Sequence, residues 1–319
     1  MKAIRIHQFG NPDVMTWEEA PNLKPLSHQI LVEIKAAGVN PVDTYIRSGT
    51  YAAKPSLPFT PGFDGAGIVK AVGKKVKKVS VGDRVYTAES LTGTYAQEVL
   101  CAETQVFPLP KKLSFEQGAG IYVPYTTASF ALFYKARAHR GESVLVHGAS
   151  GAVGIAAVQL AKSKGLTVFG TAGSKPGRDL IKAQGAKYVF DHYDPSYREK
   201  IRKITEGTGV DIILEMLANV NLGSDMELIG RKTRIIVIGS RGTVEINPRA
   251  LMQQDAEIMG LSLFYLTLQE KIEIQKTLYK DFQKGQLTPV VGTEYPFEKA
   301  AEAHRKLMQS GAYGKIILK

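Results

Sequence analysis

The residues best suited to chemistry form a short turn of small side chains, Ala149-Ser150-Gly151-Ala152-Val153-Gly154. A glycine at 151 lets the backbone approach an anion, and a glycine at 154 lets the following helix pack closely on the preceding strand. The unpaired N–H groups of such a helix attract phosphate. The pattern is AxGxxG, with alanine in place of the first glycine of GxGxxG, and by itself it also fits an ordinary tight turn.

The segments on either side of this turn favour the first interpretation. Residues 144–146 are apolar and valine-rich, which predicts a buried strand, and residues 166–170 predict a second one. Between them Ile155 to Ala161 predicts a helix with Gly165 as its C′ residue. Strand, turn, helix and strand together reach the roughly thirty residues of a βαβ unit. We therefore predict a dinucleotide-binding unit.

The end of the second strand indicates which dinucleotide is bound. NAD enzymes commonly place an acidic residue about 20 residues after the turn, where it holds the ribose 2′-hydroxyl. This chain has Gly173, Ser174 and Lys175 there, with Arg178 close by. A hydroxyl and two cations suit a 2′-phosphate, which favours NADPH. Alternatively, Ser174 caps a helix with Pro176 in its first turn, and the cations are only solvated.

The rest of the chain predicts an α/β protein of two domains. Residues 1–123 contain short apolar or alternating runs between Gly, Pro and Asp turns, which predict a β-rich barrel or sandwich-like domain. Residues 124–265 alternate strands with helices, and six strands with helical crossovers predict a doubly wound parallel sheet. Because six strands complete such a sheet, we assign residues 266–319 to the first domain.

These domains rest on a set of predicted elements. Strands are predicted at 30–39, 67–72, 82–87, 94–100, 144–146, 166–170, 187–190, 210–214, 234–239, 257–263 and 315–318. Helices are predicted after the capping box at 114–117, at 126–138, after 194–195, and at 248–253, 269–284 and 297–309.

Composition limits the function classes. A single cysteine, Cys101, excludes an intrachain disulfide and a Cys-rich zinc site. The net charge of +11 permits an anionic partner such as RNA, but no RNP-type, KH or zinc-knuckle pattern accompanies it. No export signal and no apolar run of about 18 residues is visible, so we expect a cytoplasmic protein that does not enter the membrane.

Four segments carry a family resemblance: GVNPVDTYIRSGTY at 38–51, PGFDGAGIV at 61–69, SVLVHGASGAVG at 143–154, and EMLANVNL at 215–222 with IVIGSRGTVEINPR at 236–249. Through them the chain resembles, from end to end, the zinc-independent, zeta-crystallin-like quinone oxidoreductases of the medium-chain dehydrogenase/reductase superfamily. The resemblance implies a GroES-like catalytic domain, a Rossmann domain, a cleft between them, NADPH as cofactor and a quinone as substrate.

The resemblance also bears on metal use. Metal-dependent alcohol dehydrogenases of the superfamily have a cysteine where this chain has Asn40, a histidine where it has Phe63, and a second cysteine near Val123. Phenylalanine offers no donor to zinc, so we expect no metal. Without a Lewis acid the oxidation of an unactivated alcohol lacks its main electrostatic aid, whereas a quinone accepts hydride readily. Catalysis would then rest on positioning the acceptor beside the nicotinamide.

Matching positions in similar proteins imply the site residues. The substrate end is expected to contain Asn40, Asp43, Tyr45 and Tyr51 as the catalytic set, and Tyr45 is the best candidate to hydrogen-bond the acceptor or the nicotinamide. For each of the four the alternative is a turn residue satisfied by local bonds. The residues expected to contact NADPH are Tyr45, Thr127, Ser150, Gly151, Ala152, Val153, Gly173, Ser174, Lys175, His192, Asn221, Ile238, Gly239, Ser240, Arg241, Leu261, Ser262 and Leu263.

Three points stay open at this stage. Relatives carry a phosphate-binding lysine where this chain has Gly177, so either Lys175 or Arg178 could substitute for it. Asn221 either bonds the cofactor or caps a helix. His147, like the other histidines apart from His192, has no partner pattern typical of a metal site or catalytic triad, and we expect a structural role for it.

Other functions compete with quinone reduction. An enone or alkenal double-bond reductase would need the same cofactor and would also lack zinc. Zeta-crystallin-like proteins are associated with ortho-quinones and a semiquinone product, with lens structure and with AU-rich RNA, so RNA binding is a candidate secondary role. The resemblance further implies a homodimer or homotetramer.

Overall fold

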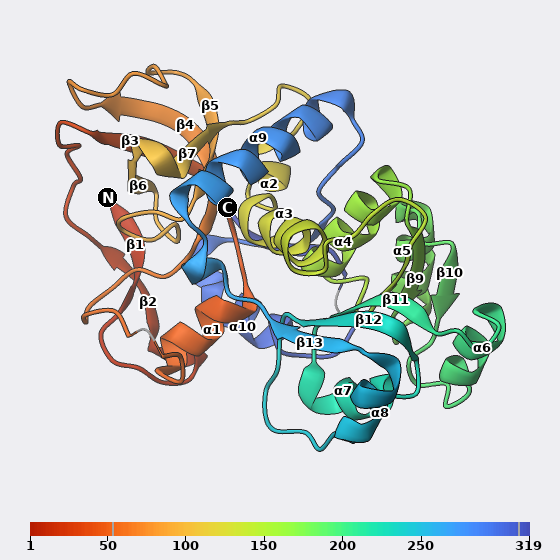
Figure 1. The fold of residues 1–319 in the computed structure, drawn as a ribbon. Coiled ribbons are helices and arrows are strands. Elements are labelled where there is room, and N and C mark those ends of the chain that lie inside the picture. Colours follow the sequence, from red (N-terminus) through yellow and green to blue (C-terminus); the bar gives the residue numbers. More distant parts are fainter. Residues whose placement is uncertain (53, 312) are drawn as a thin grey trace. The chain divides into compact units, whose positions relative to one another are not determined.

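The computed structural model describes residues 1–52, 54–311 and 313–319, which form two compact units (Figure 1). Unit 1 comprises Met1–Val123, Gln275–Gln309 and Gly314–Lys319, and unit 2 comprises Pro124–Ile274 and Ser310–Tyr313. The chain returns to unit 1 at Gln275 rather than at the predicted residue 266. The boundary lies inside one continuous helix, Leu268–Lys284. The helical sequence pattern is unbroken there, so the sequence gives no sign of the boundary.

Unit 1 is organised around a seven-stranded sheet. Its strand order is β14-β15-β3-β4-β5-β7, and β6 pairs with β3 off this path. The long strand β3 alternates in burial, so that Ile30, Val32 and Ile34 enter the core together with residues such as Val99 of β6. The strands of unit 1 are β1 Lys2–Ile6, β2 Met15–Glu19, β3 Gln29–Gly38, β4 Asp64–Val72, β5 Arg84–Ala88, β6 Glu98–Ala102, β7 Val106–Pro108, β14 Val291–Tyr295 and β15 Lys315–Leu318.

Short helices connect and cover this sheet. Helix α1, Pro41–Ser48, begins after Asn40 with proline at its first position and ends at Gly49, whose φ is +76°. The capping box predicted at Ser114 is confirmed, because Ser114 Oγ accepts a hydrogen bond from Gln117 N at the start of α2, Phe115–Gly118. The predicted helix 297–309 is shorter than expected: a 3₁₀ turn at Phe297–Lys299 precedes α10, Ala300–Leu307.

Unit 2 is a six-stranded parallel sheet with the order β10-β9-β8-β11-β12-β13. From β8 the next two strands along the chain, β9 and β10, are added on one side of the sheet, and β11, β12 and β13 are added on the other side. The strand order therefore reverses between β8 and β11. The predicted doubly wound sheet is confirmed. Its strands are β8 Ser143–Val146, β9 Thr167–Thr171, β10 Tyr188–Phe190, β11 Val210–Glu215, β12 Ile229–Val237 and β13 Glu257–Gly260.

Helices follow the strands of this sheet in the expected rhythm. Helix α4 ends at Ser163, and Gly165, with φ of +80°, is its C′ residue as predicted. None of the helices formed by the described residues is long and apolar enough to cross a membrane. The helices are α3 Tyr122–Ser129, α4 Ala152–Ser163, α5 Lys175–Gln184, α6 Tyr197–Ile204, α7 Ala218–Asp225, α8 Pro248–Gln254 and α9 Leu268–Lys284.

Several predicted elements differ from the structure. The predicted helix 126–138 begins earlier, as α3, and continues as a π-helix at Phe130–Lys135. The last strand ends at Gly260 instead of 263, and a 3₁₀ turn follows at Leu263–Tyr265. Strands β2, β7 and β14 were not predicted, because they are short and their polar or proline-containing sequences lack a clear apolar alternation.

Candidate functional site

The glycine-rich turn links β8 to α4 at the carboxyl edge of the parallel sheet, where doubly wound sheets bind their ligands. Gly148 has φ of +56°, and Gly151 is the N-cap of α4, so the first helical N–H groups belong to residues 152–154. A Cβ on Gly154 would lie 2.5 Å from the backbone of Ala149 and of Gly148. The glycine at 154 therefore permits the close helix–strand packing that its position in the motif predicts.

The segment expected to hold the 2′-phosphate follows β9. Ser174 caps α5, as the alternative interpretation held, and its Oγ accepts a hydrogen bond from Gly177 N at 3.1 Å. A Cβ on Gly177 would lie 3.0 Å from Ser174 Oγ and 3.1 Å from Ser150 Oγ. Hydroxyls of the glycine-rich turn and of the α5 N-terminus thus converge beside Gly177. A lysine at 177 would crowd both of them, which gives a physical reason for the glycine.

The two candidate cations differ in what they bind. Arg178 is partly buried and donates to Asp191 Oδ2 at 2.7 Å and to the carbonyl of Ala172. Lys175 is exposed and pairs with Asp179 one turn along the same helix, at 2.6 Å. Exposed pairs of this kind contribute little and exchange readily. The Lys175 side chain is therefore held less firmly than that of Arg178.

The other predicted cofactor residues in unit 2 lie mostly beyond the carboxyl ends of its strands. A Cβ on Gly173 would lie 2.6 Å from His192 Nε2, which places His192, after β10, beside the segment that follows β9. Burial lowers the pKa of His192, although Asp191 opposes this. The remaining residues are Thr127 in α3, Asn221 in α7, Ile238, Gly239, Ser240 and Arg241 after β12, and Leu261, Ser262 and Leu263 after β13.

Asn221 does not cap α7. Leu217 is the N-cap, and the Asn221 side chain donates to Glu215 Oε1 at 3.1 Å. Glu215 Oε1 also accepts from Leu217 N at 2.7 Å. The capping alternative is therefore wrong, because a buried acceptor at the end of β11 holds this amide.

The substrate-end residues of unit 1 lie on or beside α1. Asn40 and Asp43 are buried, and Asn40 N donates to Asp43 Oδ2 at 2.8 Å. Tyr45 is half-buried, and its hydroxyl forms no hydrogen bond to the residues that the structure describes. Tyr51 N donates to the carbonyl of Tyr45. Asn40 and Asp43 are thus joined at the start of the helix, Tyr51 is joined to the Tyr45 backbone at its end, and Tyr45 keeps a phenolic donor for a ligand.

Sequence reasoning missed two partners of Asn40. Lys315 Nζ lies 2.5 Å from Asn40 Oδ1 and 2.6 Å from Asp64 Oδ2, and both charged side chains are buried. Asn40 Nδ2 donates to Asp64 Oδ2 at 3.0 Å, and Val123 N donates to Asp64 Oδ1 at 2.8 Å. The Lys315 side chain passes over Gly38, where a Cβ would lie 2.5 Å from Lys315 Cε. The absence of a side chain at position 38 therefore leaves room for the lysine.

A second buried chain of polar groups continues from Asp43. Tyr95 OH lies 3.1 Å from Asp43 Oδ2 and 3.2 Å from His304 Nε2, and Arg47 lies 3.1 Å from His304 Nδ1. Burial raises the pKa of Asp43 to about 7. Burial, with the nearby Arg47 charge, lowers the pKa of His304 to about 3, so His304 is neutral at physiological pH.

His147 has partners that the sequence did not reveal. Its Nε2 lies 2.8 Å from Asp225 Oδ1 and 3.9 Å from Glu215 Oε2, and all three side chains are buried. These are residue types that ligate metals, and their candidate ligand atoms all lie within 4.8 Å of one another. The expectation that His147 lacks such a partner pattern is therefore wrong, because residues 147, 215 and 225 meet only when β8, β11 and α7 pack together.

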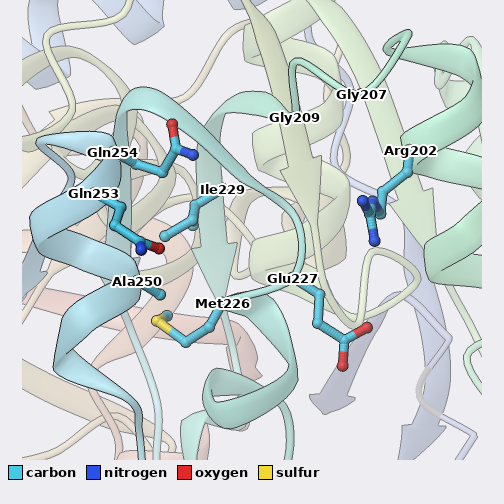
Figure 2. Close-up of a pocket in the computed structure, with 9 residues that line it drawn as sticks. All are labelled: Arg202, Gly207, Gly209, Met226, Glu227, Ile229, Ala250, Gln253 and Gln254. Carbon is cyan, nitrogen blue, oxygen red and sulfur yellow. The ribbon is translucent and has the colours of Figure 1, made fainter.

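A pocket of about 260 Å³ in unit 2 lies elsewhere (Figure 2). It is bordered by Gly209, just before β11, and by Ile229, the first residue of β12. Both positions are at the amino ends of parallel strands, on the edge opposite the glycine-rich turn. Arg202 and Glu227 point into the same region in Figure 2, and we assign this pocket no part in the dinucleotide site.

Two family models match the chain, one within unit 1 and one mostly within unit 2. The family model described as "Alcohol dehydrogenase GroES-like domain" matches residues 26–111, and the one described as "Zinc-binding dehydrogenase" matches residues 152–277. The quinone oxidoreductases of Rattus norvegicus and Homo sapiens are each 48% identical to this chain over 320 residues, covering all of it and 97% of their own length. The chain belongs to the quinone oxidoreductase family.

Solved structures agree with this membership of the medium-chain dehydrogenase/reductase superfamily. The Escherichia coli quinone oxidoreductase complexed with NADPH is similar with a TM-score of 0.91 and 30% identity, over 100% of this chain and 99% of that one. A structure titled as an NAD-dependent alcohol dehydrogenase has a TM-score of 0.93 and 29% identity, with the same coverage. The fold is therefore shared by enzymes that differ in cofactor and substrate.

The name of the second family model raises the question of zinc. At the positions of the superfamily's catalytic zinc ligands, this chain offers the Asn40 amide and the Phe63 ring, with Val123 nearby. The Asn40 carbonyl is engaged by the Lys315 ammonium, and Asp64 is engaged by Lys315, Asn40 and Val123 N. A divalent cation beside a buried ammonium would be repelled, so these residues do not fit zinc.

Proposed function

We propose that this protein is an NADPH-dependent quinone reductase that works without zinc. The observation that carries the cofactor choice is the end of β9, where Gly173, Ser174 and Lys175 stand in place of the acidic residue that would bind a free ribose hydroxyl. Ser174 uses its oxygen as an acceptor within the helix cap, so its proton stays available to a phosphate. The NADPH complex of the related E. coli enzyme supports the same choice.

The proposal of zinc independence rests on Lys315. Its buried ammonium joins Asn40 and Asp64, and Asp64 in turn accepts from Val123 N. A fixed cation therefore joins the segments around residues 40, 64 and 123, which carry the metal in metal-dependent relatives. A substrate that needs a metal-bound alkoxide is thereby disfavoured, and an acceptor that spreads negative charge over a ring is favoured.

NADPH, when bound, supplies the hydride. The protein's part is to bind and orient. The α4 N-terminus and the residues 150–153 hold the pyrophosphate, and Ser174 with Lys175 holds the 2′-phosphate. In unit 1 the network of Lys315, Asp64 and Asn40 fixes the start of α1. This helix presents the Tyr45 hydroxyl, which donates a hydrogen bond to a quinone oxygen as charge develops on it.

Steady-state kinetics with 9,10-phenanthrenequinone and with a simple enone tests the proposal. The expected result is rapid NADPH oxidation with the quinone and turnover at least tenfold slower with the enone. Activity confined to the enone would assign the protein to double-bond reduction instead.

Metal analysis of the active protein, together with activity measured after chelator treatment, tests zinc independence, and the expected result is no bound zinc and full activity. Spectroscopic detection of radical product tests whether ortho-quinones accept one electron at a time.

Self-association belongs to the same proposal. Strand β13 ends the order of the six-stranded sheet, and large apolar side chains near it, Met252 and Tyr265, are 80% and 88% exposed. Both features favour a homodimer or homotetramer. Light scattering at several protein concentrations tests this. RNA binding stays a prediction from the family resemblance and the net charge of +11, and a steep loss of binding with salt would mark it as nonspecific.

A further inference from the structure

Three buried ionisable side chains lie under the carboxyl edge of the unit 2 sheet, next to the glycine-rich turn. His147 follows β8 and directly precedes Gly148, Glu215 ends β11, and Asp225 ends α7. Their side chains are 3%, 0% and 0% exposed. We call these three residues the switch-point cluster, because they lie where the strand order reverses between β8 and β11.

The cluster connects the segments that surround the proposed nucleotide site. His147 Nε2 lies 2.8 Å from Asp225 Oδ1, and its Nδ1 lies 3.5 Å from Thr171 Oγ1 at the end of β9. Glu215 Oε1 accepts hydrogen bonds from Leu217 N and from the Asn221 side chain. The ends of β8, β9 and β11 and the start of α7 are therefore joined through one small set of polar groups.

Two carboxylate oxygens in this cluster lack a hydrogen-bond donor among the described residues. They are Glu215 Oε2 and Asp225 Oδ2, and both are fully buried. Orphaned buried acceptors are costly, and two buried carboxylates repel each other. A single proton held between the two carboxyl groups would give both oxygens a partner. The cluster would then hold one imidazolium, one carboxylate and one carboxylic acid, with no net charge.

The titration directions agree with this arrangement. Burial disfavours the imidazolium, but the charge and hydrogen bond of Asp225 and the charge of Glu215 outweigh it and raise the pKa of His147 to about 9. Burial raises the pKa of Glu215 to about 7, with Asp225 adding to the effect and His147 opposing it. Outside the cluster, Arg198 and Tyr197 of α6 and His192 after β10 also act electrostatically on these groups.

We propose that the switch-point cluster is a positioning site for the bound nucleotide, in which the His147–Asp225 pair and a proton shared by Glu215 and Asp225 hold the glycine-rich turn against the β11–α7 junction. The proposal rests on the proposed binding of NADPH at this turn. Losing the shared proton leaves a buried negative charge next to the glycine-rich turn, which the proposed function assigns to the pyrophosphate. The anionic cofactor and that proton therefore favour each other's binding, as linkage requires.

Calorimetry of NADPH binding tests this linkage on the unmodified protein. If binding raises the pKa of Glu215 by one unit from about 7, titrations in buffers of different ionisation enthalpy show an uptake of about half a proton at pH 7.5. The same shift weakens the apparent affinity about sixfold between pH 6.5 and pH 8.5. Affinity that does not change with pH, together with no proton uptake, would overturn the proposal.

Glu215→Gln distinguishes positioning from a general pH effect. The amide keeps an acceptor for Leu217 N and Asn221, and its NH₂ group replaces the shared proton as a donor to Asp225. For this variant we expect NADPH binding that does not weaken between pH 6.5 and pH 8.5 and no residual proton uptake, whatever its affinity at pH 6.5. A variant that keeps the wild-type pH dependence would contradict the proposal.

Asp211→Asn is the matched control at the other edge of the sheet. Asp211 accepts from Ser143 N and from Ser143 Oγ, both at 2.7 Å, at the amino ends of β11 and β8. Its replacement is expected to lower stability but to leave the pH dependence of NADPH binding unchanged, and loss of that dependence here would contradict the proposal. If the wild-type protein binds one equivalent of metal and Glu215→Gln binds none, a cation rather than a proton lies between the two carboxyl groups. That result would overturn the proposal. Failure of wild type to bind NADPH at any pH would instead remove the proposed function, and this inference with it.

Discussion

Replacing Lys315 by methionine is expected to destabilise unit 1 by about 3–5 kcal/mol, because it leaves a buried carboxylate without its cation. The ammonium lies 2.6 Å from Asp64 Oδ2 and 2.5 Å from Asn40 Oδ1, and the two charged side chains are 3% and 0% exposed. Methionine keeps a long apolar side chain, so little packing is lost. Among the residues that the structure describes, Asp64 then retains only neutral donors, Asn40 Nδ2 and Val123 N.

Urea unfolding followed by tryptophan fluorescence measures this loss in the correct unit. The chain has one tryptophan, Trp17, which stacks on Phe297 within unit 1 at a centroid distance of 5.4 Å. Lys70→Met is the control, because the Lys70–Glu98 pair is exposed to solvent and its loss should change the free energy of unfolding very little. Adding Asp64→Asn to Lys315→Met removes the stranded charge and is expected to restore about 1–2 kcal/mol.

Two results would refute this reasoning. One is a loss for Lys315→Met no greater than that for Lys70→Met. The other is a double variant whose destabilisation equals the sum of its two single variants, because charges that compensate each other cannot be additive. Either outcome would mean that Lys315 does not neutralise Asp64, and the argument that a fixed ammonium replaces the metal would lose its basis.

Three further predictions concern cofactor, pH and packing. Lys175→Ala is expected to raise the Kd for NADPH about tenfold and leave that for NADH unchanged, by fluorescence titration. Asp43 binds its proton up to about pH 7 when folded but only to about 4 when unfolded, so stability falls as pH rises between these values; Asp43→Asn should reduce this slope in urea titrations and leave the share that comes from Glu215, while an unchanged slope would exclude Asp43 as a source. Gly154→Ala is expected to cost about 1–3 kcal/mol and to weaken NADPH binding, because its Cβ would lie 2.5 Å from backbone atoms; wild-type stability and affinity would argue against tight packing there.

Local signals predicted the parts of the fold that depend on neighbouring residues. The capping box at Ser114 and the C′ glycine at 165 each satisfy a helix end from within a few residues, and both are confirmed. The alternation of strands and helices predicted a doubly wound parallel sheet. It did not predict β2, β7 or β14, whose pairing partners rather than their own sequences make them strands.

The partners of the candidate site residues lay beyond sequence reasoning. Lys315 opens the last strand, where a lysine ordinarily faces solvent, and its partner Asp64 is 251 residues away. The clue was a charged residue directly before the apolar run Ile316-Ile317-Leu318, next to a glycine at 314. His147 likewise gains its partners only when α7 packs beneath the sheet. Such contacts depend on topology, which a linear pattern does not contain.

The measurement that tests the central claim most directly is a comparison of NADPH and NADH as electron donors to 9,10-phenanthrenequinone. The account predicts a kcat/KM at least tenfold higher with NADPH, and it predicts that Lys175→Ala narrows this ratio mainly through the KM for NADPH. Equal kcat/KM values for the two donors would contradict the assignment of the segment after β9 as a 2′-phosphate site. No quinone turnover with either donor would contradict the proposed function itself.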